Sequence, residues 1–146
     1  MITPTGVHSG QEPEAAALAV LACQGLILES YERVDAGRRS SLADLLTEDG
    51  SHAIDDDVAT GREQVRSTLA ARDAVPGRRT LHAVTNLHVR AETADRARAR
   101  YGLLLFLLSG GAPTTPRVIS TVEDVLVRHD GRWLLHSRHI RTLAGG

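Results

Sequence analysis

The segment from Thr80 to Val89 alternates in character from one residue to the next, which is the pattern of a β-strand. One side of this strand is mainly apolar, and the other side carries His82, Asn86 and His88. In a plain antiparallel sheet, the apolar side packs on the core and the polar side faces water. In a strongly curved sheet, the inner face can line a cavity, and His82 then becomes a candidate acid or base. The alternation alone leaves both arrangements open.

The chain before this strand is patterned mainly as helices, and the chain after it is patterned as strands. Residues 1–12 are polar and rich in turn-forming residues, and we expect them to form a flexible tail. Residues 13–146 read as one α+β domain, in which three helices and one short strand precede a long antiparallel sheet. The predicted helices span Pro13–Asp35, Ser41–Asp49 and Thr60 to about Val75, and the predicted strands span residues 51–55, 80–90, 96–108, 117–128 and 132–142.

The composition indicates a globular domain with an aliphatic core. Hydrophobic residues make up 42% of the 146 residues, whereas aromatic residues make up only 3%. The 17 basic residues are all arginines, which excludes Schiff-base catalysis and a P-loop because both require a lysine. The single cysteine, Cys23, lies in an apolar helical stretch and is interpreted as a core residue.

Charge and hydropathy narrow the range of partners. The formal net charge is −1, and no basic cluster is long enough to indicate a nucleic-acid groove. The apolar stretches Ala15–Leu28 and Leu103–Leu108 are shorter than the ~20 residues that span a bilayer. The N-terminus has no signal-peptide pattern. We therefore expect a cytoplasmic protein that binds neither nucleic acid nor membrane.

The polar residues do not form a metal or cofactor motif. His82 and His88 are about 20 Å apart along one strand, which is too far for a shared ion. The acidic run Asp55–Asp57 has no further ligands near it in sequence, and no Gly-rich dinucleotide loop or nucleophile elbow occurs. We therefore expect no metal and no cofactor. The remaining His, Asp, Tyr and Arg residues suit general acid–base chemistry around a cavity.

Four features together resemble a known family. They are the order of the helices, Asp35 at the end of the first helix, Gly61-Arg62-Glu63 at the start of the third, and Asp130-Gly131-Arg132-Trp133 before the last strand. From about Glu14 to Arg141, the chain is similar to the SnoaL-like branch of the superfamily that contains nuclear transport factor 2 and ketosteroid isomerase. The resemblance implies a cone-shaped, curved antiparallel sheet wrapped around the N-terminal helix, with three helices enclosing a pocket.

The strand segment 82–87 is most similar in motif to hexachlorocyclohexane dehydrochlorinase and, more distantly, to scytalone dehydratase. This likeness implies that His82 is the catalytic base and that Asp35 holds it. A neutral imidazole that is held through one nitrogen presents the other nitrogen as a base, and the carboxylate stabilises the imidazolium that forms. The chain departs from the dehydrochlorinase at Ser30, where that enzyme has a lysine.

Further pocket residues are expected from the same resemblance and from the strand alternation. Arg138 occupies a family arginine position, with an alternative role as a structural partner of Asp124. Asp55 lies beside the position of the ketosteroid isomerase base. The expected substrate-binding residues are Tyr31, Asn86, Tyr101, Ser120, Asp124, Arg138 and Asp55.

These expectations lead to a cofactor-free lyase or isomerase, namely a dehydratase, double-bond isomerase or cyclase, with an apolar secondary-metabolite intermediate as substrate. One alternative is a non-catalytic binding or assembly subunit. Another is an epoxide hydrolase or cyclase, which typically needs a carboxylate–arginine–carboxylate group that the sequence does not locate. The apolar run 101–108 also predicts a homodimer that buries the outer face of the sheet around Leu104, Phe106 and Leu108.

Overall fold

The computed structural model describes residues 11–146, so the predicted tail lies outside the described residues except for its last two positions. Those two belong to helix α1 (Gln11–Asp35), which begins slightly before the predicted Pro13 and ends at the predicted Asp35. The chain then turns at Gly37, whose φ of +78° favours glycine.

The second predicted helix is shorter than expected, and a strand begins where the last part of that helix was predicted. It is the 3₁₀ helix η1 (Arg39–Leu45), and β1 (Leu46–Ile54) follows at once. A further strand, β2 (Asp57–Thr60), precedes helix α2 (Arg62–Asp73) and was not predicted. The N-cap of α2 is Gly61, and no side chain caps this end of the helix. The remaining strands are β3 (Thr80–Thr93), β4 (Arg96–Leu107), β5 (Val118–His129) and β6 (Arg132–Gly145).

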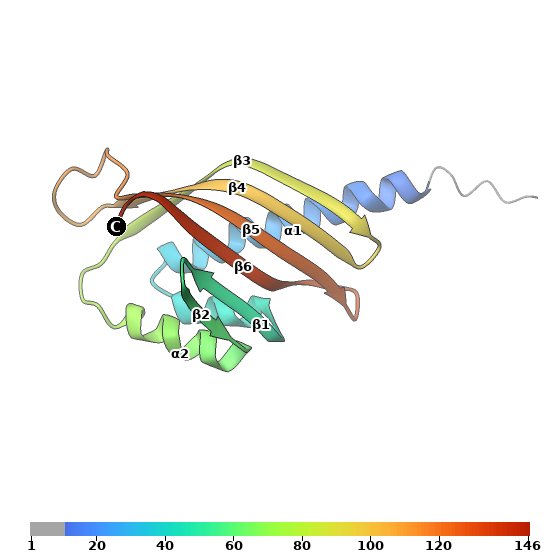
Figure 1. Ribbon diagram of the computed structural model, residues 1–146, viewed down its shortest axis with the longest axis horizontal. Coiled ribbons are helices and arrows are strands. Elements are labelled where there is room, and N and C mark those ends of the chain that lie inside the picture. The colour runs from blue at the N-terminus through green and yellow to red at the C-terminus, as the bar shows by residue number, and fades with distance from the viewer. Residues whose placement is uncertain (1–10) are drawn as a thin grey trace, which may run out of the picture.

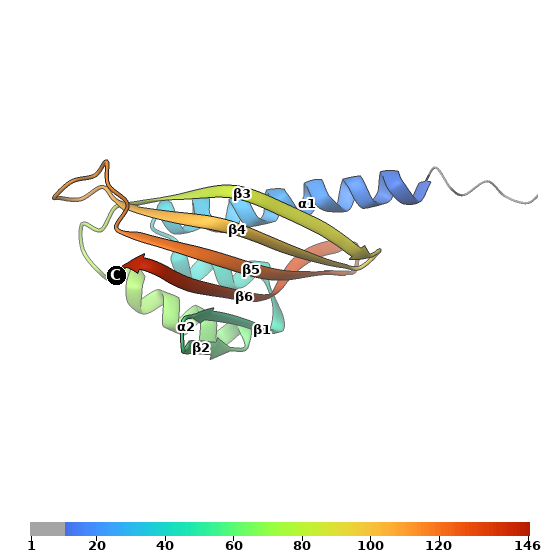
Figure 2. The ribbon, with the colours of Figure 1, turned by 45° about the horizontal axis from the view of Figure 1, so that its top comes forward.

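The six strands form one curved, open sheet in the order β2-β1-β6-β5-β4-β3. All neighbouring strands are antiparallel except β1 and β6, which are parallel, so the sheet is mixed rather than purely antiparallel. Helix α1 runs along one face of the four long strands, and α2 packs beside β1 and β2 (Figure 1, Figure 2). This arrangement confirms the expected α+β fold, in which three helices lie on a curved sheet.

A bulge in β3 decides which side chains face α1. The pairing of β3 with β4 shifts register between Thr85 and His88, and Asn86 in the bulge has a φ of +52°. Before the bulge, His82 pairs with Leu105 and lies on the concave side; after it, His88 is exposed on the convex side. The uninterrupted alternation predicted for this strand is therefore wrong, because one extra residue exchanges the two faces.

The core fills the space between α1 and the concave face of the sheet. The residues that α1 contributes to this core are mainly aliphatic. Cys23 is one of the core residues on α1 and is fully buried, as expected. By length and composition, α1 is long and apolar enough to cross a membrane, a test that the core helix of a soluble protein also passes. The prediction that no stretch reaches this length is thus wrong for the described chain, because the helix continues past Leu28 to Asp35.

Candidate active site

Asp35, the last residue of α1, contacts β3 through both carboxylate oxygens. Oδ1 lies 2.7 Å from Nδ1 of His82 and accepts a hydrogen bond of 3.0 Å from the hydroxyl of Thr80. Oδ2 accepts a hydrogen bond of 2.8 Å from the backbone N–H of His82. The two side chains are only 12% (His82) and 18% (Asp35) exposed. The predicted contact between His82 and Asp35 is therefore present. It holds both the start of β3 and the imidazole ring of His82 in position.

The electrostatics of this pair favour an ionised carboxylate beside an imidazole. Burial alone would raise the pKa of Asp35, but hydrogen bonds from the ring and backbone of His82 and from Thr80 outweigh it, so the pKa lies below its ordinary value. A carboxylate can only accept hydrogen bonds, so Nδ1 of His82 must carry a proton to bond to Asp35. In a neutral ring, Nε2 is then the nitrogen that can accept a proton. Within residues 11–146, no group hydrogen-bonds to Nε2.

His82 lies on the wall of a cavity of about 340 Å³, bounded by α1, η1, α2 and the concave side of the sheet. This volume is at the lower end of the range for small-molecule sites. The wall is mixed, because eight aliphatic residues share it with four arginines and two histidines, so it is more polar than the expected apolar pocket. The aliphatic lining residues include Val34, Leu42, Ile54, Leu103, Leu105 and Ile140.

A chain of buried polar groups stands beside His82. The hydroxyls of Tyr31 and Tyr101 are 2.8 Å apart, and the Tyr101 hydroxyl donates to Asp124 at 2.9 Å. Arg138 binds the same carboxylate twice, through Nε at 2.9 Å and Nη2 at 2.8 Å, and donates to Ser30 Oγ at 2.9 Å. Because Tyr101 donates to Asp124, Tyr31 donates to Tyr101, and both hydroxyl protons are already engaged.

Tyr31 connects this polar chain to the histidine. Its ring stacks on His82 with 5.4 Å between centroids, and the Arg138 guanidinium lies 4.6 Å from the centroid of the Tyr31 ring. Burial raises the pKa of Tyr31 to about 12, although the charge of Arg138 opposes the change. Tyr31 therefore stays protonated at neutral pH and acts as a rigid wall, not as a base.

His52 on β1 is a second histidine on the cavity wall, and sequence reasoning missed it. It is 9% exposed. Burial, followed by the charges of Arg138 and Arg72, lowers the pKa of His52 to about 3, so the ring is neutral at physiological pH. The only sequence signal was its place in a short predicted strand, and that signal did not indicate which face would be covered.

The structure brings together most of the predicted site residues. Tyr31, Ser120 and Arg138 line the cavity with His82. Tyr101 and Asp124 lie behind that wall, buried, and reach the cavity only through the polar chain. The alternative role for Arg138, as a structural partner of Asp124, is the one that these contacts show.

Two predicted pocket residues lie elsewhere. Asn86 is in the β3 bulge, exposed, and borders a hollow on the convex side of the sheet. Asp55 is exposed in the turn between β1 and β2, where its carboxylate accepts the backbone N–H of Thr142 at 2.8 Å. The prediction for Asn86 was wrong because the bulge exchanges the two faces of β3. The prediction for Asp55 was wrong because β1 ends one residue before it, so Asp55 lies in the turn.

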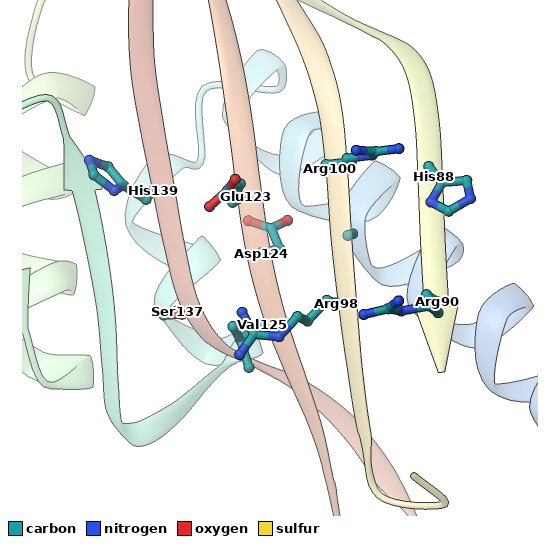
Figure 3. A pocket seen from close by; sticks show the side chains of 10 residues that line it. His88, Arg90, Arg98, Arg100, Glu123, Asp124, Val125, Ser137 and His139 are labelled. Atoms are coloured by element: carbon teal, nitrogen blue, oxygen red, sulfur yellow. The ribbon is translucent and has the colours of Figure 1, made fainter. Parts of the chain in front are cut away.

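A wider hollow of about 440 Å³ lies on the convex side of the sheet (Figure 3). Its walls are mostly charged or polar and come from β3, β4, β5 and β6. The exposed side chains there, such as Arg100 and Glu123, are solvated, and no aspartate orients a histidine in this hollow. The concave cavity is therefore the better candidate for chemistry. Within residues 11–146, no group of three or more His, Cys, Asp or Glu residues could hold a metal ion.

The fold and cavity together define a cystatin-like α+β protein, the architecture shared by nuclear transport factor 2-like proteins. The chain belongs to the SnoaL-like domain family, whose sequence model matches residues 16–139. The expected family resemblance is thus confirmed. No curated protein matches the chain significantly in sequence.

Solved structures share the fold over most of the chain. A candidate scytalone dehydratase from Novosphingobium aromaticivorans is 21% identical, with a TM-score of 0.77, covering 90% of this chain and 89% of that chain. LinA is 21% identical, with a TM-score of 0.73 and 88% coverage of each chain. ActVI-ORFA from Streptomyces coelicolor is 20% identical, with a TM-score of 0.72, covering 84% of this chain and 96% of that chain. At these identities, the likeness concerns the fold alone.

Proposed function

We propose that this protein is a small-molecule lyase or isomerase in which His82 is the general base and Asp35 positions it. Membership of the SnoaL-like family supports a lyase- or isomerase-type role. The observation that carries the proposal is the 2.7 Å contact between His82 Nδ1 and Asp35 at the wall of a partly aliphatic cavity. It leaves Nε2 as the available base at the wall of the cavity.

In the proposed reaction, Nε2 of His82 removes a proton from the carbon next to a carbonyl group. The C–H electrons form an enolate, and Asp35 stabilises the resulting imidazolium. In a dehydration, the enolate electrons then form the C=C bond as the β-hydroxyl leaves, and the imidazolium returns its proton to give water. In an isomerisation, the same proton is returned to a different carbon. Neither route needs a cofactor.

Ser120 is the candidate donor to the substrate oxygen. It lines the cavity and is 4% exposed, and its hydroxyl bonds to no other group among the described residues. The tyrosine hydroxyls are less suitable, because Tyr31 and Tyr101 already donate within the buried polar chain. A single hydroxyl donor would stabilise the enolate by about 1 kcal/mol or more.

We favour dehydration, because a candidate scytalone dehydratase is among the proteins of the same fold. A suitable probe is 3-hydroxy-1-tetralone, which loses water to give the fluorescent 1-naphthol. The wild-type protein is expected to accelerate this reaction, and His82→Gln is expected to abolish the acceleration. The control is His88→Gln, a histidine that is exposed on the convex side of the same strand. Equal loss in both variants, or in neither, would refute the proposal.

The rival function is a binding or assembly subunit without catalysis. It predicts that the protein takes up 3-hydroxy-1-tetralone but releases it unchanged. A parallel test for isomerisation uses 3-cyclohexen-1-one, whose conversion to the conjugated 2-cyclohexen-1-one is followed by ultraviolet absorbance. Binding of both compounds with neither reaction would favour the rival. Epoxide opening loses support, because among the described residues Arg138 binds one carboxylate, Asp124, and its third contact is the hydroxyl of Ser30.

A further inference from the structure

The cavity that holds His82 is lined by four arginines, and among residues 11–146 no acidic side chain lines it. The four are Arg39, Arg72, Arg78 and Arg138. A purely apolar substrate, which the sequence led us to expect, would leave these charges without a ligand partner. The internal ion pairs of each arginine show how much positive charge the cavity retains.

Arg138 contributes little net charge to the cavity. Its guanidinium makes two hydrogen bonds to Asp124, and both residues are almost completely buried. A bidentate pair of this kind leaves the two opposite charges close together and largely cancelled.

Arg39 is only partly neutralised. Its nearest carboxylate oxygen, on Asp73, lies 3.9 Å away. The two oxygens of Asp73 instead accept the backbone N–H groups of Arg39 and Ser40, each at 2.9 Å. Burial, and then the charges of Arg78 and Arg72, lower the pKa of Arg39, although Asp73 and Asp35 oppose this change. Arg78 and Arg72 are therefore each close enough to repel Arg39.

Arg72 and Arg78 form no ion pair with any carboxylate among the described residues. Arg72 is half-buried at the end of α2, and Arg78 lines the cavity from the exposed segment between α2 and β3. The charge of Arg72 reaches into the cavity, because Arg72 also contributes, after burial and Arg138, to the lowered pKa of His52. Two cations, with a third beside them, thus line a cavity whose wall is only partly aliphatic.

We propose that the substrate is an organic acid with an apolar skeleton, and that Arg72 and Arg78, beside Arg39, bind its carboxylate. This inference rests on the proposed function and specifies its substrate class. Arginine matches a carboxylate with two parallel hydrogen bonds, and the low polarity of the cavity strengthens them. Binding to these arginines would hold the skeleton in the same cavity whose wall carries Leu103, Leu105 and His82.

Isothermal titration calorimetry with 2-naphthoate and 2-naphthamide tests this inference, because the two ligands share a skeleton and differ in charge. The wild-type protein is expected to bind the acid about tenfold more tightly than the amide, the factor that corresponds to one charged hydrogen bond. The double variant Arg72→Gln/Arg78→Gln is expected to remove this preference. The control is Arg79→Gln, an exposed neighbour outside the cavity wall, which is expected to keep it.

Equal affinity of the two naphthalene ligands for the wild-type protein would overturn the inference. A preference for the acid that persists in the double variant would also overturn it. Neither result would bear on the proposed function, which is tested with the neutral 3-hydroxy-1-tetralone and the wild-type cavity. Conversely, an acid preference without turnover of that ketone would support an anion-binding cavity and count against catalysis by His82.

Discussion

The carboxylate of Asp35 binds His82 twice, once at ring Nδ1 (2.7 Å) and once at the backbone N–H (2.8 Å). The end of α1 and the start of β3 are therefore joined at the same residue that carries the candidate base. An asparagine at position 35 has one acceptor oxygen instead of two, so it can serve the ring or the backbone, but not both as well as the carboxylate does.

For this reason, we expect Asp35→Asn to slow the dehydration of 3-hydroxy-1-tetralone by about 10²-fold or more, and His82→Gln by ~10²–10⁴-fold. The double variant should be little slower than His82→Gln alone, because residues that act as one unit are not additive. Initial rates of 1-naphthol fluorescence measure all three variants. If the rate reduction in the double variant equalled the product of the two single reductions, Asp35 would act independently of the histidine.

The lowered pKa of Asp35 also predicts a pH-dependent contribution to stability. A carboxyl group with a depressed folded pKa stabilises the fold above its unfolded pKa, and this contribution is lost as pH falls through the folded value. Asp35→Asn should therefore cost about 1–3 kcal/mol at pH 7 and progressively less below about pH 4. Urea unfolding of both proteins at pH 7 and pH 3.5 measures the difference. A cost that does not change with pH would contradict the stabilisation of an ionised Asp35 by these hydrogen bonds.

The buried pair of Asp124 and Arg138 predicts a larger effect. The side chains are 0% (Asp124) and 1% (Arg138) exposed, so removal of the carboxylate leaves a buried cation with no ionic partner. Asp124→Asn should lower the free energy of unfolding by about 3–5 kcal/mol. The double variant Asp124→Leu/Arg138→Met should recover part of this loss, because it removes both charges. If Asp124→Asn cost under about 1 kcal/mol in urea unfolding, the pair would not be a structural element.

The lowered pKa of His52 predicts that the protein is sensitive to mild acid. Below about pH 6.5 the unfolded chain takes up a proton at this histidine, whereas the folded ring stays neutral until about pH 3. Stability should therefore fall with pH in this window, by up to about 1.4 kcal/mol per pH unit from this residue. His52→Gln should flatten the fall in Tm between pH 7 and pH 5, and the exposed control His88→Gln should not. An unchanged slope in His52→Gln would contradict the assignment.

The homodimer remains a prediction, and the register of the strands shows which residues would form its interface. On the convex side, Leu81 pairs with Phe106 and Leu104 pairs with Ile119, which joins four apolar side chains across three strands. Leu81 is 49% exposed and Ile119 is 38% exposed. We expect light scattering to give the mass of a dimer, and Phe106→Arg to give that of a monomer. The control is Leu18→Arg on α1, at a position 67% exposed. A wild-type monomer at micromolar concentration would contradict the prediction.

Local sequence was sufficient for the elements whose boundaries depend on local chemistry. Gly37 ends α1, and the turn at Asp130-Gly131 has positive φ at both residues, as this pair of residues favours. The contact of Asp35 with His82 required more than alternation, since it combines the end of a helix with a strand far along the chain. The family resemblance supplied that long-range information.

The features that local sequence did not predict depend on long-range pairing. The bulge at Asn86 is a feature of the pairing of β3 with β4, and it determines which histidine faces α1. His52 is buried in a strand, β1, that pairs in parallel with β6, the last strand of the chain. No local pattern distinguishes these positions from ordinary strand residues, so Asn86 was placed in the pocket and His52 was not considered.

The central claim is that a base at position 82 acts inside the cavity, and the most direct test is a probe that needs only a base. In 5-nitrobenzisoxazole, removal of one C–H proton breaks the N–O bond and releases a coloured cyanophenolate. The account predicts saturable turnover by the wild-type protein and a kcat that falls by ~10²–10⁴-fold in His82→Gln, with KM changed far less. A kcat that is unchanged in His82→Gln would contradict the account.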